Sequence, residues 1–163
     1  MPGLVLADAL PTSTWLLLDG SARRSDFLQT AVADLDMSDR VSVLAARAED
    51  AGRNPALRMA FGAVVARGFG PPPSVAEAAA PFLAVGGVLV VSEPPQEPDA
   101  DRWPDSGLAE VGLADGVHLD VGSRFFVARQ REPCPSRYPR RWPQQRRRPL
   151  YNVPRGTDGV GST

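Results

Sequence analysis

Short apolar segments alternate with amphipathic segments along the first 113 residues of the chain. Residues 21–35 and 74–83 carry apolar side chains at helical spacing, and Ser21 is a typical helix-starting residue. Short apolar runs precede and follow these helical segments, at 15–18, 41–44, 63–66 and 88–91. Such runs are typical of strands that are buried on both faces of a sheet. This alternation predicts βαβ units and a parallel sheet.

Two further strands, 117–121 and 125–128, follow a short helix predicted around Leu108. Only three residues separate these strands, which is too few for a parallel crossover and favours an antiparallel pair. We therefore predict a mostly parallel α/β sheet with an antiparallel edge, formed by residues 1–128.

The hydrophobic periodicity ends after Ala128, and prolines alternate with arginines in residues 129–163, so we expect an extended, largely unstructured tail. Residues 1–128 carry 17 acidic residues against 9 arginines, a net charge of −8, whereas the tail carries 2 against 9, a net charge of +7. All 18 basic residues are arginine. Guanidinium groups pair with phosphates and stack on bases, so the tail points to a nucleic acid, although a disordered solubilising end is the alternative.

The chain has one cysteine and one histidine, Cys134 and His118. These numbers exclude an internal disulfide and disfavour a zinc site or a Cys-His catalytic pair, so no metal is expected. We interpret His118 as structural and Cys134 as an incidental thiol. The apolar runs are shorter than the roughly 18 residues that a transmembrane helix needs, so a cytoplasmic protein without membrane contacts is the default.

Polar residues follow three of the predicted strands, at the sheet edge where ligands bind in doubly wound folds. Asp19 offers two acceptor oxygens for the hydroxyls of a ribose, or alternatively caps the helix at Ser21. The triplet 47–49 offers backbone contacts for an adenine, or is a solvated loop. Arg67 faces a ligand, or pairs with Glu49 or Asp19.

The glycine-rich phosphate loop of such domains is missing from the sequence. Gly-x-Gly-x-x-Gly is expected between the first strand and first helix, but Met1-Pro2-Gly3 runs straight into a helical pattern at 4–10. We therefore expect that the first strand and most of its loop are absent, because the start is assigned at an internal methionine. Two strands would then lack a neighbouring strand. Each backbone group left without a hydrogen bond would lower the stability of the fold by about 1–3 kcal/mol.

Several segments together resemble the bacterial 16S ribosomal RNA methyltransferase G family, also called glucose-inhibited division protein B. The segment from Asp19 to Leu28 is similar to the acid-Ser-x-x-Lys-Arg-x-x-Phe-Leu segment of that family. It departs from the pattern at Gly20, where the family has Ser, and at Arg23, where the family has Lys. The other matching segments, within a resemblance that spans about residues 1–150, are 1–7, 47–49, 66–67, 86–87, 138–141 and 149–150.

The resemblance implies a class I methyltransferase fold and an S-adenosylmethionine-dependent enzyme that methylates N7 of a guanine in 16S rRNA. Its partner would be that RNA or the small ribosomal subunit. The implied cofactor contacts are Met1, Asp19 (ribose), Ala48 and Glu49 (adenine) and Arg67. We expect RNA contacts, with aromatic stacking faces among the arginines, at Arg137, Tyr138, Arg140, Arg141, Arg146, Arg147 and Arg148.

No catalytic residue is assigned, because N7 has an in-plane lone pair and no proton to lose. Without the glycine loop we expect the chain to bind S-adenosylmethionine poorly. A non-catalytic relative that binds RNA or another partner is therefore the alternative function. A dinucleotide-dependent oxidoreductase is disfavoured by the missing glycine motif and by the antiparallel strand pair.

Overall fold

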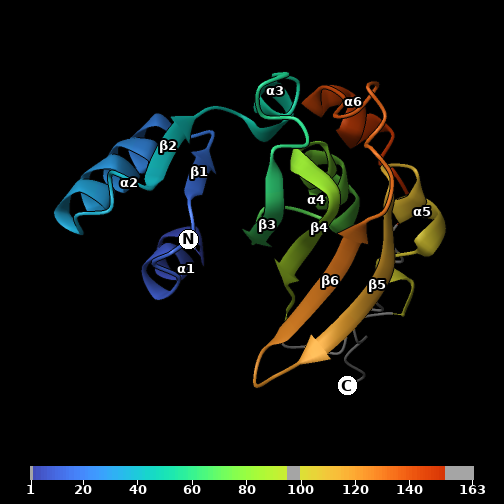
Figure 1. The fold of residues 1–163 in the computed structure, drawn as a ribbon. Helices are drawn as coiled ribbons and strands as arrows, with labels where there is room; N and C mark the ends of the chain where they lie inside the picture. The colour runs from blue at the N-terminus through green and yellow to red at the C-terminus, as the bar shows by residue number, and fades with distance from the viewer. Residues whose placement is uncertain (1, 95–99, 153–163) are drawn as a thin grey trace, which may run out of the picture.

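The computed structural model describes residues 2–94 and 100–152 (Figure 1). Its strands follow the order that the hydrophobic pattern predicts. The strands are β1 (Trp15–Asp19), β2 (Val41–Ala45), β3 (Phe61–Arg67), β4 (Leu83–Ser92), β5 (Leu113–Asp120) and β6 (Arg124–Gln130). The helices are α1 (Pro2–Ala9), α2 (Ala22–Asp34), α3 (Ala48–Ala51), α4 (Pro72–Ala79), α5 (Asp105–Ala109) and α6 (Trp142–Arg147), with short 3-10 turns η1 (Ala80–Phe82) and η2 (Ala100–Arg102).

The strands form one two-stranded and one four-stranded sheet. β1 and β2 pair in parallel, with Trp15 beside Val41 and Asp19 beside Ala45. The larger sheet has the order β3-β4-β6-β5, in which β3 and β4 are parallel and β6 is antiparallel to both of its neighbours. The predicted antiparallel pair is thus confirmed. Gly122, with a φ of +83°, lies in the turn that joins β5 to β6.

β1 and β3 are each hydrogen-bonded to one neighbouring strand within the described residues, β1 to β2 and β3 to β4. α1 contacts both strands. Its close approach to β1 depends on Gly3, because a Cβ at that position would lie 2.7 Å from Cδ2 of Leu17.

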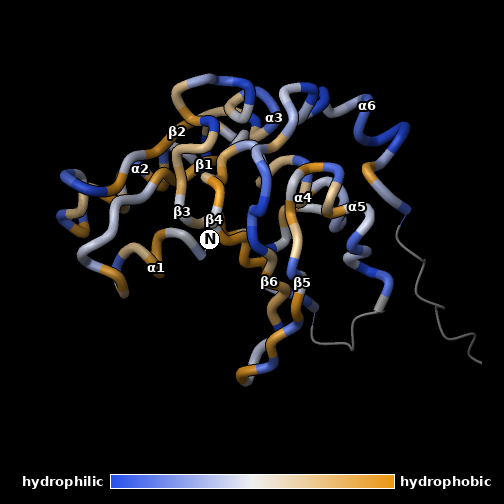
Figure 2. The backbone as a smooth tube through the Cα atoms, turned by 45° about the vertical axis from the view of Figure 1, so that its right-hand side comes forward, coloured by the Kyte–Doolittle hydropathy of each residue, from blue (hydrophilic) through white to orange (hydrophobic). Residues whose placement is uncertain are grey.

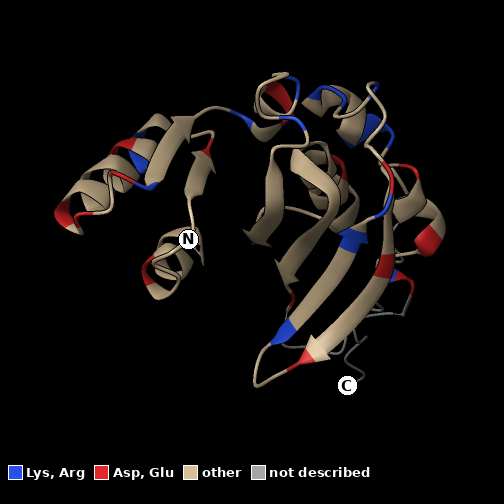
Figure 3. Cartoon of the chain, in the orientation of Figure 1, with Lys and Arg blue, Asp and Glu red and all other residues tan. Residues whose placement is uncertain are grey.

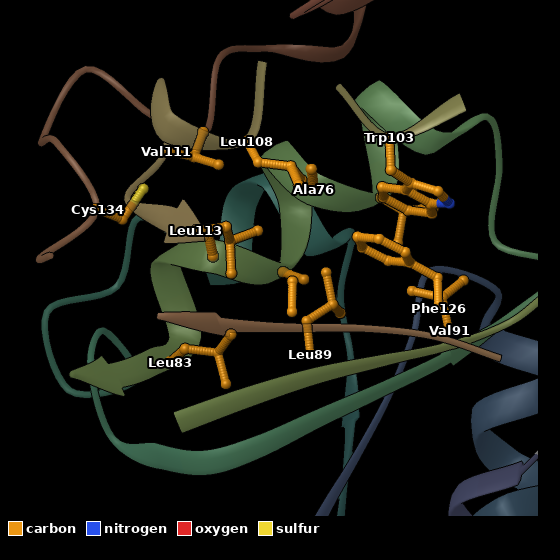
Figure 4. Close-up of a cluster of buried hydrophobic side chains, with 14 of the residues drawn as sticks. Ala76, Leu83, Leu89, Val91, Trp103, Leu108, Val111, Leu113, Phe126 and Cys134 are labelled. Carbon is orange, nitrogen blue, oxygen red and sulfur yellow. The ribbon is translucent and has the colours of Figure 1, made fainter. Parts of the chain in front are cut away.

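Two clusters of buried apolar side chains stabilise the two sheets. The smaller cluster joins α1 and α2 to β1 and β2 and includes Leu17, Leu28 and Val32. The larger cluster lies between the four-stranded sheet and helices α4 and α5, where the rings of Trp103 and Phe126 stack with 4.2 Å between their centroids (Figure 4). In Figure 2 the strands are mostly coloured as hydrophobic, whereas α6 is mostly hydrophilic. Each large buried aliphatic side chain contributes about 1.5–3 kcal/mol.

The chain after Ala128 packs against the body, which corrects the prediction of an extended, largely unstructured tail. β6 continues to Gln130, and α6 forms a further helix. Cys134 and Tyr138 are buried in the larger cluster. Residues 153–163, the rest of the predicted tail, lie outside the described part of the chain.

Arg58 explains why this segment is held without a hydrophobic repeat of its own. Its guanidinium donates hydrogen bonds to the backbone carbonyl oxygens of Gly52, Cys134 and Tyr138, at 3.0, 2.9 and 2.7 Å. Charged hydrogen bonds of this kind contribute about 1.5–3 kcal/mol each. Cys134 and Tyr138 are 76 and 80 residues from Arg58 in sequence, so no local pattern predicts these two contacts.

Candidate cofactor and RNA sites

Two cavities open where strands β1 to β4 end, at the edge where ligands bind in parallel sheets. The first has a volume of about 310 Å³ and is lined by residues that follow β1, β2 and β3, and by α6. The second has a volume of about 380 Å³ and is lined by residues that follow β3 and β4, with Arg102 and Trp103. Both volumes are within the usual range for small-molecule sites, and Phe69 lines both cavities.

Asp19 lies beside the first cavity, and both of its carboxylate oxygens accept hydrogen bonds. Oδ1 accepts from the backbone N–H of Ser21 and Oδ2 accepts from Nε of Arg24, each at 2.8 Å. The hydrogen bond from Arg24 lowers the pKa of this carboxyl below its ordinary value. Asp19 therefore does support the start of α2, as the alternative interpretation proposed. A carboxylate oxygen accepts more than one hydrogen bond, so a contact to ribose stays a prediction.

Arg47, Ala48 and Glu49 form one wall of the first cavity, at the start of α3. Nε of Arg47 donates to Oε1 of Glu49 at 2.5 Å, and the Glu49 side chain is only 10% exposed. The Arg47 guanidinium also lies 5.8 Å from the centroid of the Trp142 ring. The triplet is thus a fixed part of the cavity and not a freely solvated loop.

α6 also lines the first cavity through Trp142 and Gln145, a position that the sequence did not predict. Gln145 is buried, and its side-chain amide donates to the backbone carbonyl oxygen of Arg140 at 2.7 Å. Pro143, near the start of α6, is a sequence signal for a helix but gives no indication of its place in space. The segment predicted as a tail therefore contributes to the site in the body.

Arg67 is exposed at the end of β3 and lines the second cavity. Its alternative partners Asp19 and Glu49 are paired with Arg24 and Arg47 instead, so the ion pairs expected as alternatives do not form.

Glu93 follows β4 in the wall of the same cavity. Its buried carboxylate accepts hydrogen bonds from Nε of Arg102 and Nε1 of Trp103, at 2.6 and 2.9 Å. The second cavity thus combines an exposed guanidinium, which forms no ion pair with the acidic side chains of residues 2–94 and 100–152, with a buried acid paired to Arg102.

Most of the arginines predicted to bind RNA are exposed in the structure, on α6 and the segment before it (Figure 3). Arg137 forms a surface ion pair with Glu110 at 3.0 Å, and at such exposure the pair contributes little to stability. The exposed predicted residues are Arg137, Arg141, Arg146, Arg147 and Arg148.

Tyr138 and Arg140 do not fit the predicted RNA contacts. Tyr138 is 7% exposed, and its hydroxyl donates to Oε2 of Glu110 at 3.2 Å, so it has no free ring face for a base. The Arg140 guanidinium binds the buried carboxylate of Glu77. Both residues hold the segment onto the body, which the local Tyr-Pro-Arg pattern could not distinguish from an RNA-binding arm.

Met1, the remaining predicted cofactor contact, lies outside the described residues. Within residues 2–94 and 100–152, no cluster of three or more His, Cys, Asp or Glu side chains has the arrangement of a metal site. Over the same residues no helix combines the length and the apolar character that crossing a bilayer requires.

The arrangement of strands and helices is shared with solved methyltransferases of low sequence identity. A variant of the 16S rRNA (adenine(1408)-N(1))-methyltransferase from Catenulisporales acidiphilia is 16% identical, with a TM-score of 0.59 over 82% of this chain and 81% of that one. The O-methyltransferase TomG from Streptomyces achromogenes, in complex with SAM, is 18% identical, with a TM-score of 0.55 over 79% of this chain and 67% of that one. The fold is therefore that of the class I methyltransferases.

The sequence also matches one family within that class. A model of the rRNA small subunit methyltransferase G family matches residues 1–97. Proteins with the name ribosomal RNA small subunit methyltransferase G are 28% identical in Prochlorococcus marinus (strain NATL2A) and 33% identical in Deinococcus radiodurans, over 91% and 92% of this chain. The chain belongs to this family, which confirms the resemblance of its motifs. It spans 63% and 62% of the length of these two relatives.

Proposed function

We propose that the protein is an S-adenosylmethionine-dependent methyltransferase that transfers a methyl group to N7 of a guanine in 16S rRNA. The observation that carries the proposal is a polar cavity at the carboxyl ends of β1 and β2, in a chain of the rRNA small subunit methyltransferase G family. The residues around this cavity support the proposal because their polar groups suit the binding of an adenosine.

Asp19, Ala48 and Glu49 fit the adenosine half of the cofactor. The carboxylate of Asp19 offers acceptors for the two ribose hydroxyls, and the Ala48 backbone and the Glu49 carboxylate offer contacts to adenine. Glu49 is already fixed by Arg47, so little rotamer entropy is lost on binding. Arg67 and Met1 are the other proposed contacts. When bound, the cofactor supplies a methyl group on a positively charged sulfur.

The protein's contribution to this reaction is alignment. N7 of guanine carries a lone pair in the plane of the ring and no proton, so no general base is needed. Holding the two reactants at the correct distance and angle accelerates such a transfer strongly. The cavities are adjacent, so two reactants bound at this edge of the sheet can meet. A site without a cysteine or histidine nucleophile is consistent with this chemistry.

The exposed arginines on α6 and before it are the proposed RNA-binding surface. They lie next to the first cavity because Trp142 and Gln145 of the same helix line it. Phosphate contacts by arginine provide affinity and orientation. We propose 16S rRNA, alone or in the small ribosomal subunit, as the partner and the cytoplasm as the location.

Calorimetry with S-adenosylmethionine tests the cofactor part of the proposal and separates the two candidate functions. We expect weak binding, because the sequence has no Gly-x-Gly-x-x-Gly loop, and we expect Glu49→Gln to weaken it further. Asp26→Asn, a change on the exposed face of α2, is the control and should bind as the unchanged protein does. Tight RNA binding without any cofactor binding would favour the non-catalytic relative instead.

A further inference from the structure

Phe69 is an exposed aromatic residue at the junction of the two cavities. It follows β3, its side chain is 51% exposed, and it lines both the 310 Å³ and the 380 Å³ cavity. Gly68 precedes it with a φ of +57°, a conformation that glycine adopts without strain. Pro71 and Pro72 follow shortly after and restrict the backbone. The loop therefore presents the phenyl ring at a defined place on the sheet edge.

Phe69 differs from other exposed apolar residues in its position beside the two cavities, more than in its exposure. Single exposed apolar side chains are common on protein surfaces. Phe27 on α2 is exposed to a similar degree, 55%, but lines neither cavity. Trp103 and Phe126, by contrast, stack on each other inside the core. Phe69 alone among these rings lines both cavities and leaves about half of its surface exposed.

We propose that Phe69 stacks on the guanine that receives the methyl group and holds it at the boundary between the two cavities. The inference rests on the proposed function and adds a positioning residue to it. Stacking uses the faces of a base and leaves its edges free, so the N7 lone pair remains available to the methyl group in the first cavity. Aromatic stacking of single-stranded bases recurs in RNA recognition.

The nature of the contact defines what Phe69 does and does not select. Every base has a π-face, so stacking on phenylalanine accepts any base. Phe69 therefore orients the target and contributes binding energy, while groups that contact the base edges or the surrounding RNA choose the guanine. Glu93 is not available for this purpose, because its side chain is only 1% exposed and its carboxylate faces Arg102 and Trp103 inside the protein.

The test compares methylation of 16S rRNA by Phe69→Ala, Phe69→Trp and Phe27→Ala proteins. Loss of a stacking contact lowers affinity by about 5- to 150-fold per base, so Phe69→Ala should lower kcat/KM for RNA by a factor in that range. Its affinity for S-adenosylmethionine should stay within about twofold, because the proposed adenosine contacts are made by Asp19, Ala48 and Glu49. Phe69→Trp should restore most of the activity, and Phe27→Ala should match the unchanged protein.

The outcomes distinguish this inference from the proposed function. If the unchanged protein methylates RNA and Phe69→Ala is equally active, Phe69 does not hold the target. If Phe69→Ala is inactive but Phe69→Trp is not restored, or cofactor affinity falls in parallel, the residue acts through the fold or the cofactor, and the inference is wrong. If the unchanged protein methylates no RNA, the proposed function itself fails.

Discussion

The buried carboxylate of Glu77 on α4 accepts three hydrogen bonds from Arg140. The backbone N–H and Nε of Arg140 donate to Oε1 at 2.7 and 2.8 Å, and Nη2 donates to Oε2 at 2.5 Å. The Glu77 side chain is 1% exposed and the Arg140 side chain 25%. This ion pair fixes the segment that leads into α6, and with it the wall of the first cavity.

Removing the carboxylate should therefore destabilise the protein strongly. Glu77→Ala leaves a partly buried guanidinium without its partner, a change that typically costs about 3–5 kcal/mol. Denaturant unfolding of the variant and of the unchanged protein measures this difference in the free energy of unfolding. Arg131→Ala breaks an ion pair with Asp115 in which both side chains are more than half exposed, and should cost less than about 1 kcal/mol. Equal effects of the two substitutions would contradict the structural role of Arg140.

The stability of the protein should depend on Cys134 at alkaline pH. Burial raises the pKa of its thiol to about 11, whereas an exposed thiol titrates near about 8.5. The folded state keeps the thiol protonated, so its contribution is complete below the unfolded pKa and is lost as pH rises towards 11.

This dependence is measured as the difference in free energy of unfolding between the unchanged protein and Cys134→Ala. The stability of the unchanged protein relative to the variant should fall by on the order of 2 kcal/mol between pH 8 and pH 11, and stay constant between pH 6 and pH 8. A difference that is constant up to pH 11 would show that Cys134 is accessible.

Asp19 and Arg24 provide a matched pair of substitutions for cofactor binding. Both Asp19→Ala and Arg24→Ala remove their ion pair, but only the former removes the proposed ribose acceptor. Asp19→Ala should weaken binding of S-adenosylmethionine by about 1.5–3 kcal/mol, the usual contribution of hydrogen bonds to a charged group. Arg24→Ala should have a smaller effect by calorimetry. If both variants bind equally weakly, Asp19 acts only on the start of α2.

The three arginines 146–148 should contribute to RNA affinity through phosphate contacts. Each contact to single-stranded RNA adds about −0.7 to the slope of log affinity against log salt concentration. Replacing Arg146, Arg147 and Arg148 with alanine should make the slope shallower by up to about 2. Arg23→Ala, on the exposed side of α2, should leave it unchanged. An unchanged slope in the triple variant would place the RNA elsewhere.

Local patterns predicted most of the elements because their periodicity is contained in a few residues. The strand at 15–18 is observed as β1, and Ser21 precedes α2 as predicted. β4 was predicted too short, because Gly86 and Gly87 interrupt its apolar run although they lie within the strand. Glycines often mark the end of an element, which makes the interior position of this pair unpredictable from the local pattern.

The packing of the C-terminal segment could not be predicted in the same way. Arg58 and Glu77 bind it from positions more than sixty residues away in sequence. These are long-range polar contacts, and an arginine that forms one looks the same in sequence as an arginine exposed for RNA. Arg140 and Arg141 are neighbours with different environments for this reason, since one is paired with Glu77 and the other is exposed.

The most direct test of the proposed activity is to identify the methylated nucleoside. The protein is incubated with 16S rRNA lacking this modification and with labelled S-adenosylmethionine at a concentration that saturates a weak site, and the RNA is digested for mass spectrometry. We predict label in 7-methylguanosine, greatly reduced with Arg67→Ala although that variant stays folded by circular dichroism. Label in a different nucleoside, or none although cofactor and RNA both bind, would contradict the account.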